Sequence, residues 1–132
     1  EAFTRERYAQ ALAASPSAVV DAALGTRGVQ LEGSFDASGR PQVAFVGVYR
    51  RCAGEQGLFM AIVEPQGQRP RMRFLVEVPD SGSTLGSFAA LGRESDGALA
   101  VWWCADCTSG VRIEFNRDSR GFFVGGPAAV SR

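Results

Sequence analysis

The stretch Gly97–Gly126 constrains the fold more than any other, because it combines the densest apolar run with both tryptophans and two of the three cysteines. Ala98–Cys104 is apolar at successive positions, which is typical of a strand covered on both faces. Val111–Phe115 instead alternates apolar and polar side chains, as a strand with one wet face does. A glycine-containing link joins the two, and the polar turn Asn116–Gly121 leads into a short last strand. The stretch therefore predicts successive antiparallel strands.

The beginning of the chain favours a helix over residues 2–25. Ala2–Ala14 is dominated by Ala, Arg, Glu, Gln and Leu, which are good helix formers. Its apolar stripe recurs at three- and four-residue steps, through Tyr8, Ala11, Leu12, Ser15 and Val19. Pro16 interrupts this pattern, so either one helix kinks near Ser15 or a second short helix covers Ser17–Leu24.

After Gly28 the apolar period changes to that of strands. Val43–Tyr49 and Leu58–Val63 are apolar on both faces and are predicted to be central strands. Met72, Phe74, Val76 and Val78 are expected on the buried face of the next strand, while Thr84–Leu91 fits either a weak strand or a short helix. The sequence thus predicts one α+β domain over 1–132, with an N-terminal helix (2–25) on an antiparallel meander of about six to seven strands (28–126) and a tail (127–132).

The composition points away from an enzyme. The chain has no net charge, and its fourteen basic residues are all arginine, with no lysine and no histidine. The usual general base and the commonest metal ligand are therefore missing. No nucleophile motif or phosphate-binding glycine loop occurs. We expect no catalysis, no cofactor and no metal.

The cysteines raise two alternatives. Trp103–Cys107 matches the W-C-x-x-C pattern of thioredoxin-type redox sites, but the residues that follow have strand period where that chemistry needs a helix. A zinc site would need Asp106 as a fourth ligand beside Cys52, Cys104 and Cys107. We expect instead a structural disulfide between Cys104 and Cys107, with Cys52 either free or the alternative partner.

Two groups of arginines are candidate contacts for an anion or a partner. One group has two-residue spacing, which on a regular strand directs side chains to one face, and consists of Arg69, Arg71 and Arg73. The second comprises Arg112, Arg117 and Arg120, with carboxylates interleaved. Either group fits phosphate or carboxylate binding, or a solvated sheet face. A contact with DNA is left open, with no further support in the sequence.

The two ends of the chain resemble the headpieces of GspH/FimT-like minor pilins and type II secretion pseudopilins. The segments that carry the resemblance are Ala11–Val19, Gly28–Leu31, Val111–Phe115 and Arg120–Gly121. Pro16 stands where that family carries a helix former, and the family's Trp-x-x-Gly segment is absent from mid-chain. The resemblance implies a non-catalytic filament subunit whose partners are other subunits.

The resemblance also implies a periplasmic or extracellular protein, anchored in the inner membrane before assembly through a segment missing from this chain. The chain itself has no apolar run near the ~20 residues that span a bilayer. The alternative function is a free periplasmic or secreted binding or inhibitor module.

Overall fold

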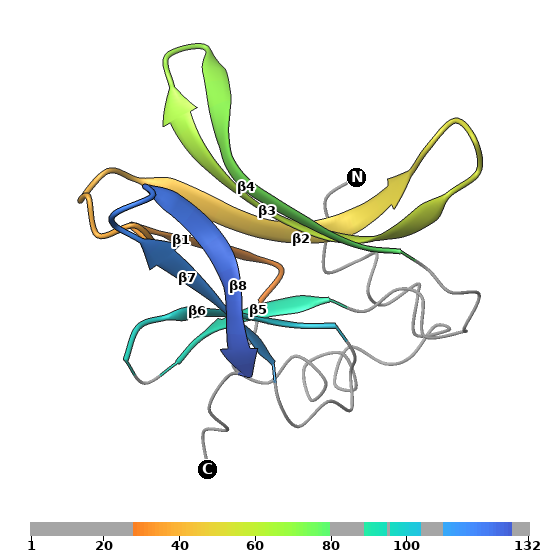
Figure 1. The fold of residues 1–132 in the computed structure, drawn as a ribbon. Helices are drawn as coiled ribbons and strands as arrows, with labels where there is room; N and C mark the ends of the chain where they lie inside the picture. The colour runs from red at the N-terminus through yellow and green to blue at the C-terminus, as the bar shows by residue number, and fades with distance from the viewer. Residues whose placement is uncertain (1–27, 80–88, 95, 104–109, 128–132) are drawn as a thin grey trace.

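The computed structural model describes residues 28–79, 89–94, 96–103 and 110–127, which form eight strands and no helix (Figure 1). The strands are β1 (Gln30–Gly33), β2 (Gln42–Arg50), β3 (Gln56–Gln66), β4 (Arg69–Pro79), β5 (Ala90–Arg93), β6 (Leu99–Trp102), β7 (Val111–Asn116) and β8 (Gly121–Pro127). No helix in these ranges is long and apolar enough to cross a membrane.

The strands form two antiparallel sheets of four. Sheet A has the order β1-β2-β3-β4 and sheet B the order β5-β6-β7-β8, and sheet A lies above sheet B in Figure 1. Each sheet is a meander, so every strand pairs with its neighbour in sequence. The predicted central strands β2, β3 and β6 do occupy interior positions. Strands that are apolar on both faces sit inside a sheet because both faces are then covered.

The prediction of an α+β fold with one continuous meander is therefore wrong. The described chain is all β, and it passes from one sheet to the other after β4. Two sheets bury each other's apolar faces, whereas one open sheet would leave a face uncovered. The predicted helix over 2–25, the segment 84–88 and the end of the predicted tail at 128–132 lie outside the described residues.

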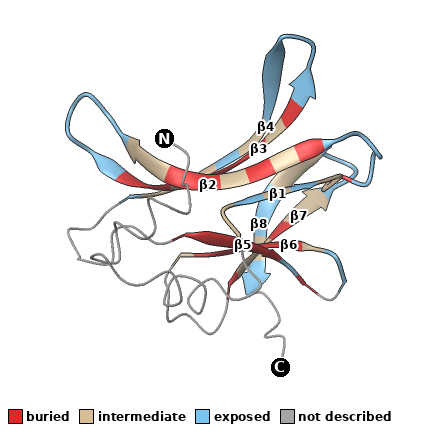
Figure 2. Ribbon diagram, turned by 180° about the vertical axis from the view of Figure 1, so that it is seen from behind, coloured by how far each residue is buried: buried red, intermediate tan, exposed pale blue. Residues whose placement is uncertain are grey.

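One hydrophobic core fills the space between the sheets. Its members from sheet A include Val46, Met60 and Ile62, and those from sheet B include Leu91 and Val101, all inaccessible to solvent. Figure 2 shows these buried segments in the middle of the strands, with the tips of the β2–β3 and β3–β4 hairpins exposed. The sandwich is thus held together by burial of apolar side chains from both layers.

The β1 and β5 edges of the two sheets are joined by backbone hydrogen bonds. Gly28 and Leu91 exchange two bonds, each with 2.7 Å between nitrogen and oxygen. Arg93 reinforces this side, because its guanidinium donates to the Glu32 carbonyl at 3.2 Å and lies 4.9 Å from the centre of the Phe35 ring. The opposite edges, β4 and β8, are joined in a different way, through side chains.

A β-bulge interrupts the regular alternation of β4. Ile62 pairs with Phe74 but the next residue, Val63, pairs with Met72, so Arg73 is an extra residue in the ladder. A bulge changes the direction of the side chains around it. Met72, predicted on the buried face, therefore points outward and is 54% exposed. Phe74 remains on the side that faces the core.

Replacement of Ile62 by alanine should lower the free energy of unfolding by about 2–5 kcal/mol, because a cavity remains in the core. Leu75→Ala is the matched control: this residue lies on the adjacent strand but is 48% exposed. It should change the unfolding free energy by less than about 0.5 kcal/mol. Denaturant titration of both variants measures the two effects, and equal losses would contradict the placement of the core.

Candidate functional site: an ionic cluster between two hairpins

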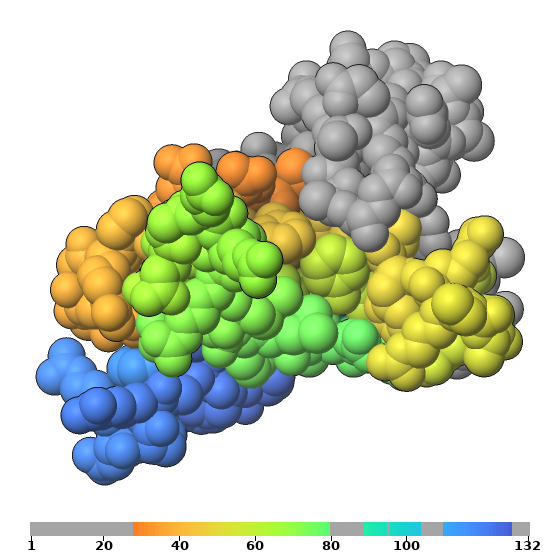
Figure 3. All heavy atoms as spheres, turned by 90° about the horizontal axis from the view of Figure 1, so that it is seen from above, coloured from red at the N-terminus to blue at the C-terminus, as the bar shows by residue number. Residues whose placement is uncertain are grey.

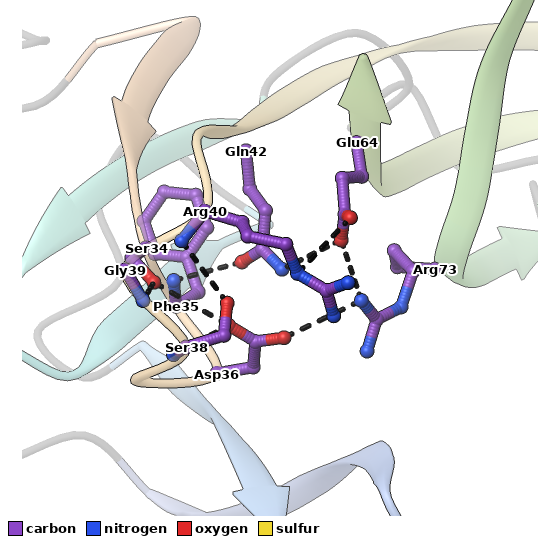
Figure 4. Close-up of polar contacts among 9 residues, drawn as sticks. All are labelled: Ser34, Phe35, Asp36, Ser38, Gly39, Arg40, Gln42, Glu64 and Arg73. Atoms are coloured by element: carbon purple, nitrogen blue, oxygen red, sulfur yellow. Dashed lines mark hydrogen bonds and ion pairs between the residues drawn. The ribbon is translucent and has the colours of Figure 1, made fainter. Parts of the chain in front are cut away.

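The most concentrated group of buried polar side chains centres on Arg73. Its Nη1 lies 2.6 Å from Glu64 Oε2 and 3.3 Å from Asp36 Oδ2. These three side chains are only 10%, 9% and 3% exposed, respectively. Gln42 and Arg40 complete the group (Figure 4). We call these five residues the Arg73 cluster.

Three segments bring the charged members together. Arg73 is the bulge residue of β4, and Glu64 lies on β3 just before the turn of the same hairpin. Asp36 comes from the β1–β2 loop, where its Oδ1 accepts a hydrogen bond from the Ser38 backbone N–H at 3.0 Å. This bond closes a local turn of the kind that aspartate favours. The loop therefore holds the carboxylate in place before it meets the arginine.

Gln42 links the loop to the hairpin inside the protein. It is inaccessible to solvent, its Oε1 accepts from the Phe35 backbone N–H at 2.8 Å, and its Nε2 donates to Glu64 Oε2 at 3.4 Å. Arg40 lies at the surface with its Nε 3.3 Å from Glu64 Oε1. The two carboxylates thus face two guanidinium groups, and the cluster has no excess charge.

The surroundings hold both carboxyl groups in the ionised form. Burial alone would raise the pKa of Asp36, but hydrogen bonds from Ser38 and Gln42 and the charge of Arg73 lower it to about 2. Burial likewise acts to raise the pKa of Glu64, and hydrogen bonds from Arg73 and Gln42 outweigh it, so that this pKa is lowered too. General acid–base catalysis near neutral pH needs the opposite shift. This arrangement suits a structural contact.

The Arg73 cluster also reaches sheet B. The guanidinium carbon of Arg73 lies 5.9 Å from the centre of the Phe122 ring on β8. The Phe74 and Phe122 rings are 6.1 Å apart, and Phe115 on β7 is 5.0 Å from Phe122. Side chains, and not backbone pairing, therefore join β4 to β8 at this edge of the sandwich.

The predicted group of Arg69, Arg71 and Arg73 is divided by the bulge. Arg69 and Arg71 are exposed on the β3–β4 hairpin, whereas Arg73 is directed inward. The equal spacing in sequence thus does not place the three side chains in equivalent surroundings.

The second predicted group is divided as well. On β7, Arg112 Nη1 contacts Glu94, its Nη2 lies 2.9 Å from Asp96 Oδ2, and its Nε lies 3.5 Å from Glu114 Oε1. Arg117 and Arg120 are exposed in the β7–β8 turn. Arg112 is therefore committed to ion pairs within sheet B, and the two turn residues remain available to solvent.

The predicted cysteine pairing falls mostly outside the described residues. Cys52 is an exposed free thiol in the β2–β3 turn, while Cys104 and Cys107 are not described. The Cys104–Cys107 bond therefore stays a prediction. Within the described ranges, no group of three or more His, Cys, Asp or Glu side chains is arranged to hold a metal ion.

Sequence reasoning missed Asp36, Gln42 and Glu64. A signal was present for two of them, because Gln42 is in phase with the buried residues of β2 and Glu64 with those of β3. A polar residue in the buried phase of a strand needs a partner inside the protein. The identity of the partner depends on the bulge and the loop, which the strand period does not reveal.

Asp36 should make the stability depend on pH in acid. Its pKa falls from 3.8 to about 2 on folding, so its contribution is complete above about pH 4 and is lost as the pH falls toward 2. Asp36→Asn should lower the unfolding free energy by roughly 2 kcal/mol at pH 7, and the difference from the parent should shrink toward pH 2. Urea titrations across this range check the slope, and parallel curves for the two proteins would refute it.

Arg73→Leu should lower the unfolding free energy by about 3–5 kcal/mol, because it leaves buried Asp36 without an arginine and Glu64 with only the exposed Arg40. Arg71→Leu is the matched control on the same strand, and should change it by less than about 0.5 kcal/mol. Thermal and denaturant unfolding both report this contrast. Similar effects of the two replacements would show that the inward direction of Arg73 has no energetic consequence.

Comparison with known proteins adds no family. The chain matches no protein-family model, and neither a curated protein nor a solved structure matches it. The Arg73 cluster and the surface around it are therefore the features from which a function can be inferred.

Proposed function

We propose that this chain is a non-catalytic protein-binding module whose partner contacts β4 and β8. One observation carries the proposal. The large apolar side chains that the described residues leave exposed are Met72 and Leu75 on β4, and Phe123 and Val124 on β8. Aromatic residues and methionine are enriched where proteins bind one another. We call these four residues, together with the exposed Arg69, Arg71, Arg117 and Arg120, the β4–β8 surface.

The topology supports this location. β4 and β8 are the end strands of their sheets, and each pairs with a described strand on one side only. Figure 3 shows the segments of β4 and β8 next to each other on one side of the molecule. The two edge strands meet through the contact between Phe74 and Phe122, whose ring centres are 6.1 Å apart.

The Arg73 cluster would make this surface rigid before binding. Arg73 connects β4 to the β1–β2 loop through Asp36 and to β8 through Phe122. A surface that is ordered in the free protein loses less conformational entropy on binding. The cluster therefore serves the proposed function by fixing the strands that contact the partner.

The absence of catalysis is part of the proposal. The buried carboxylates with lowered pKa values, Asp36 and Glu64, are paired with arginine. Such groups neither take up nor release protons near neutral pH.

A filament subunit of the minor-pilin kind is the second candidate. The resembling segments Val111–Phe115 and Arg120–Gly121 lie on β7 and at the start of β8, beside the same surface. In that case the partners are other subunits in a periplasmic or extracellular filament. Both candidates use the β4–β8 surface, and they differ in whether the partner is another protein of the filament or a free target.

Two measurements on the same variants test the proposal. Peptides selected by display against the immobilised chain should lose binding to Met72→Ser and Phe123→Ser, and should keep it for Ala53→Ser in the distant β2–β3 turn. Sedimentation velocity should show a monomer for the free binding module.

Self-association that the same two replacements abolish would favour the filament subunit. If selection enriches no peptide and the chain remains monomeric, or if bound peptides are insensitive to both replacements, the proposed binding surface is wrong.

A further inference from the structure

We propose that the β4–β8 surface recognises an acidic protein segment that also carries apolar residues; this inference rests on the proposed function and specifies its partner. The observation behind it is an uneven distribution of arginine partners. Among the described residues, Arg40, Arg51, Arg73 and Arg112 each form an ion pair with a carboxylate. Six described arginines form none with a described residue. Arg50 and Arg93 are two of them, and the other four are the exposed Arg69, Arg71, Arg117 and Arg120.

Arg69 and Arg71 lie on the β3–β4 hairpin, and Arg117 and Arg120 lie in the β7–β8 turn. Arg71 precedes Arg73 by two residues and Arg120 precedes Phe122 by two, and the Arg73 guanidinium carbon is 5.9 Å from the Phe122 ring centre. The β3–β4 hairpin and the β7–β8 turn therefore start from the same junction. Figures 1 and 3 both show the blue β7–β8 turn beside the orange β1–β2 loop.

The β3–β4 hairpin and the β7–β8 turn, which start near the Arg73–Phe122 contact, carry an excess of positive charge. Asp36 and Glu64 are already matched by Arg73 and Arg40. The exposed Asp118 offsets only one of the four free arginines. Since the whole chain has no net charge, the excess is local, and it favours a ligand that brings negative charge to these segments.

The exposed apolar residues that follow the arginines in sequence favour protein over nucleic acid. Met72 follows Arg71 directly, and Phe123 with Val124 follows the turn that carries Arg117 and Arg120. Arginine binds carboxylates through two parallel hydrogen bonds. Apolar side chains beside it give further contact area with the aliphatic or aromatic residues of a peptide. A mixed acidic and apolar segment fits both features.

The hairpin itself favours recognition through side chains. Pro65 and Pro70 lie directly opposite each other in the β3–β4 ladder. Neither has a backbone N–H, so the hairpin near its tip has few donors with which to pair an added strand. The partner is therefore expected to contact the arginine and apolar side chains, and not to extend the sheet at this point.

The test uses fluorescence anisotropy with the full chain and a short synthetic peptide in which glutamates alternate with phenylalanine and leucine. The same peptide with glutamine in place of glutamate should bind at least about tenfold more weakly. Raising the salt from about 0.1 M to about 1 M should weaken binding of the glutamate peptide, because the Debye length falls from about 10 Å to about 3 Å.

Charge reversal locates the site. Arg71→Glu and Arg117→Glu should each weaken binding of the glutamate peptide by about tenfold. Arg50→Glu is the matched control, because Arg50 is also exposed and without an ion pair to a described residue but lies at the end of β2 beside the β2–β3 turn. It should leave binding unchanged within about twofold. The three arginine side chains that are replaced are all exposed, so the replacements do not open the core.

Each outcome decides something. Equal binding of the glutamate and glutamine peptides, both sensitive to Met72→Ser, would overturn the acidic partner and leave the protein-binding module intact. Binding of neither peptide would overturn the acidic partner and, together with an empty display selection, the module as well. Tighter, salt-sensitive binding of a single-stranded DNA oligomer or of anionic phospholipid vesicles, lost in Arg71→Glu, would reassign the surface to another class of ligand.

Discussion

Arg73 brings a permanent positive charge into a site that is almost closed to solvent, and the arrangement of three segments depends on it. A buried guanidinium is costly unless carboxylates pair with it and satisfy its donors. Its partners, Asp36 and Glu64, come from a loop and a strand that are distant in sequence. Pairing all three fixes the β1–β2 loop against the β3–β4 hairpin, and the contact with Phe122 extends this to β8. An apolar replacement of a whole buried ion cluster is often neutral or stabilising, whereas removal of one partner is strongly destabilising.

The bulge in β4 links this constraint to the proposed function. One extra residue directs Arg73 inward and Met72 outward, while Arg69 and Arg71 remain exposed on the same strand. Arg73 thus binds the hairpin to the β1–β2 loop, whereas Arg69 and Arg71 remain accessible to a partner. On the opposite edge of the sandwich, the Gly28–Leu91 backbone bonds and Arg93 already join the sheets. The β4–β8 edge has no such backbone link, so its side chains are left to make contacts inside and outside the molecule.

Most of the strands could be predicted from the sequence, because they have a run of apolar residues or a clear alternation. β5 (Ala90–Arg93) was not among them, since Thr84–Leu91 fitted either a strand or a helix. In β2, β3 and β6, the runs that are apolar on both faces correctly predicted that these strands lie in the interior of a sheet. The division into two sheets could not be predicted, since the period of a strand reports that a face is buried but not what covers it. The prediction that Met72 is buried was wrong, because a bulge shifts the alternation of side chains by one residue. The cluster was indicated in the sequence by Gln42 and Glu64, which are polar residues at positions where the strand alternation predicts burial. Their partner Arg73 was nevertheless grouped with the exposed arginines, because only its spacing in sequence was considered.

The central claim is that Asp36 and Arg73 act as one unit, and a double-mutant cycle tests it most directly. The unfolding free energies of the parent, Asp36→Asn, Arg73→Leu and the double variant give the interaction energy between the two side chains. Residues in one ion-pair network typically show coupling of about 0.5–3 kcal/mol. The account predicts favourable coupling of more than about 1 kcal/mol, with the double variant more stable than the sum of the single losses implies. Additive losses, within about 0.3 kcal/mol, would show that the two side chains are neighbours without a shared role, and would contradict the account.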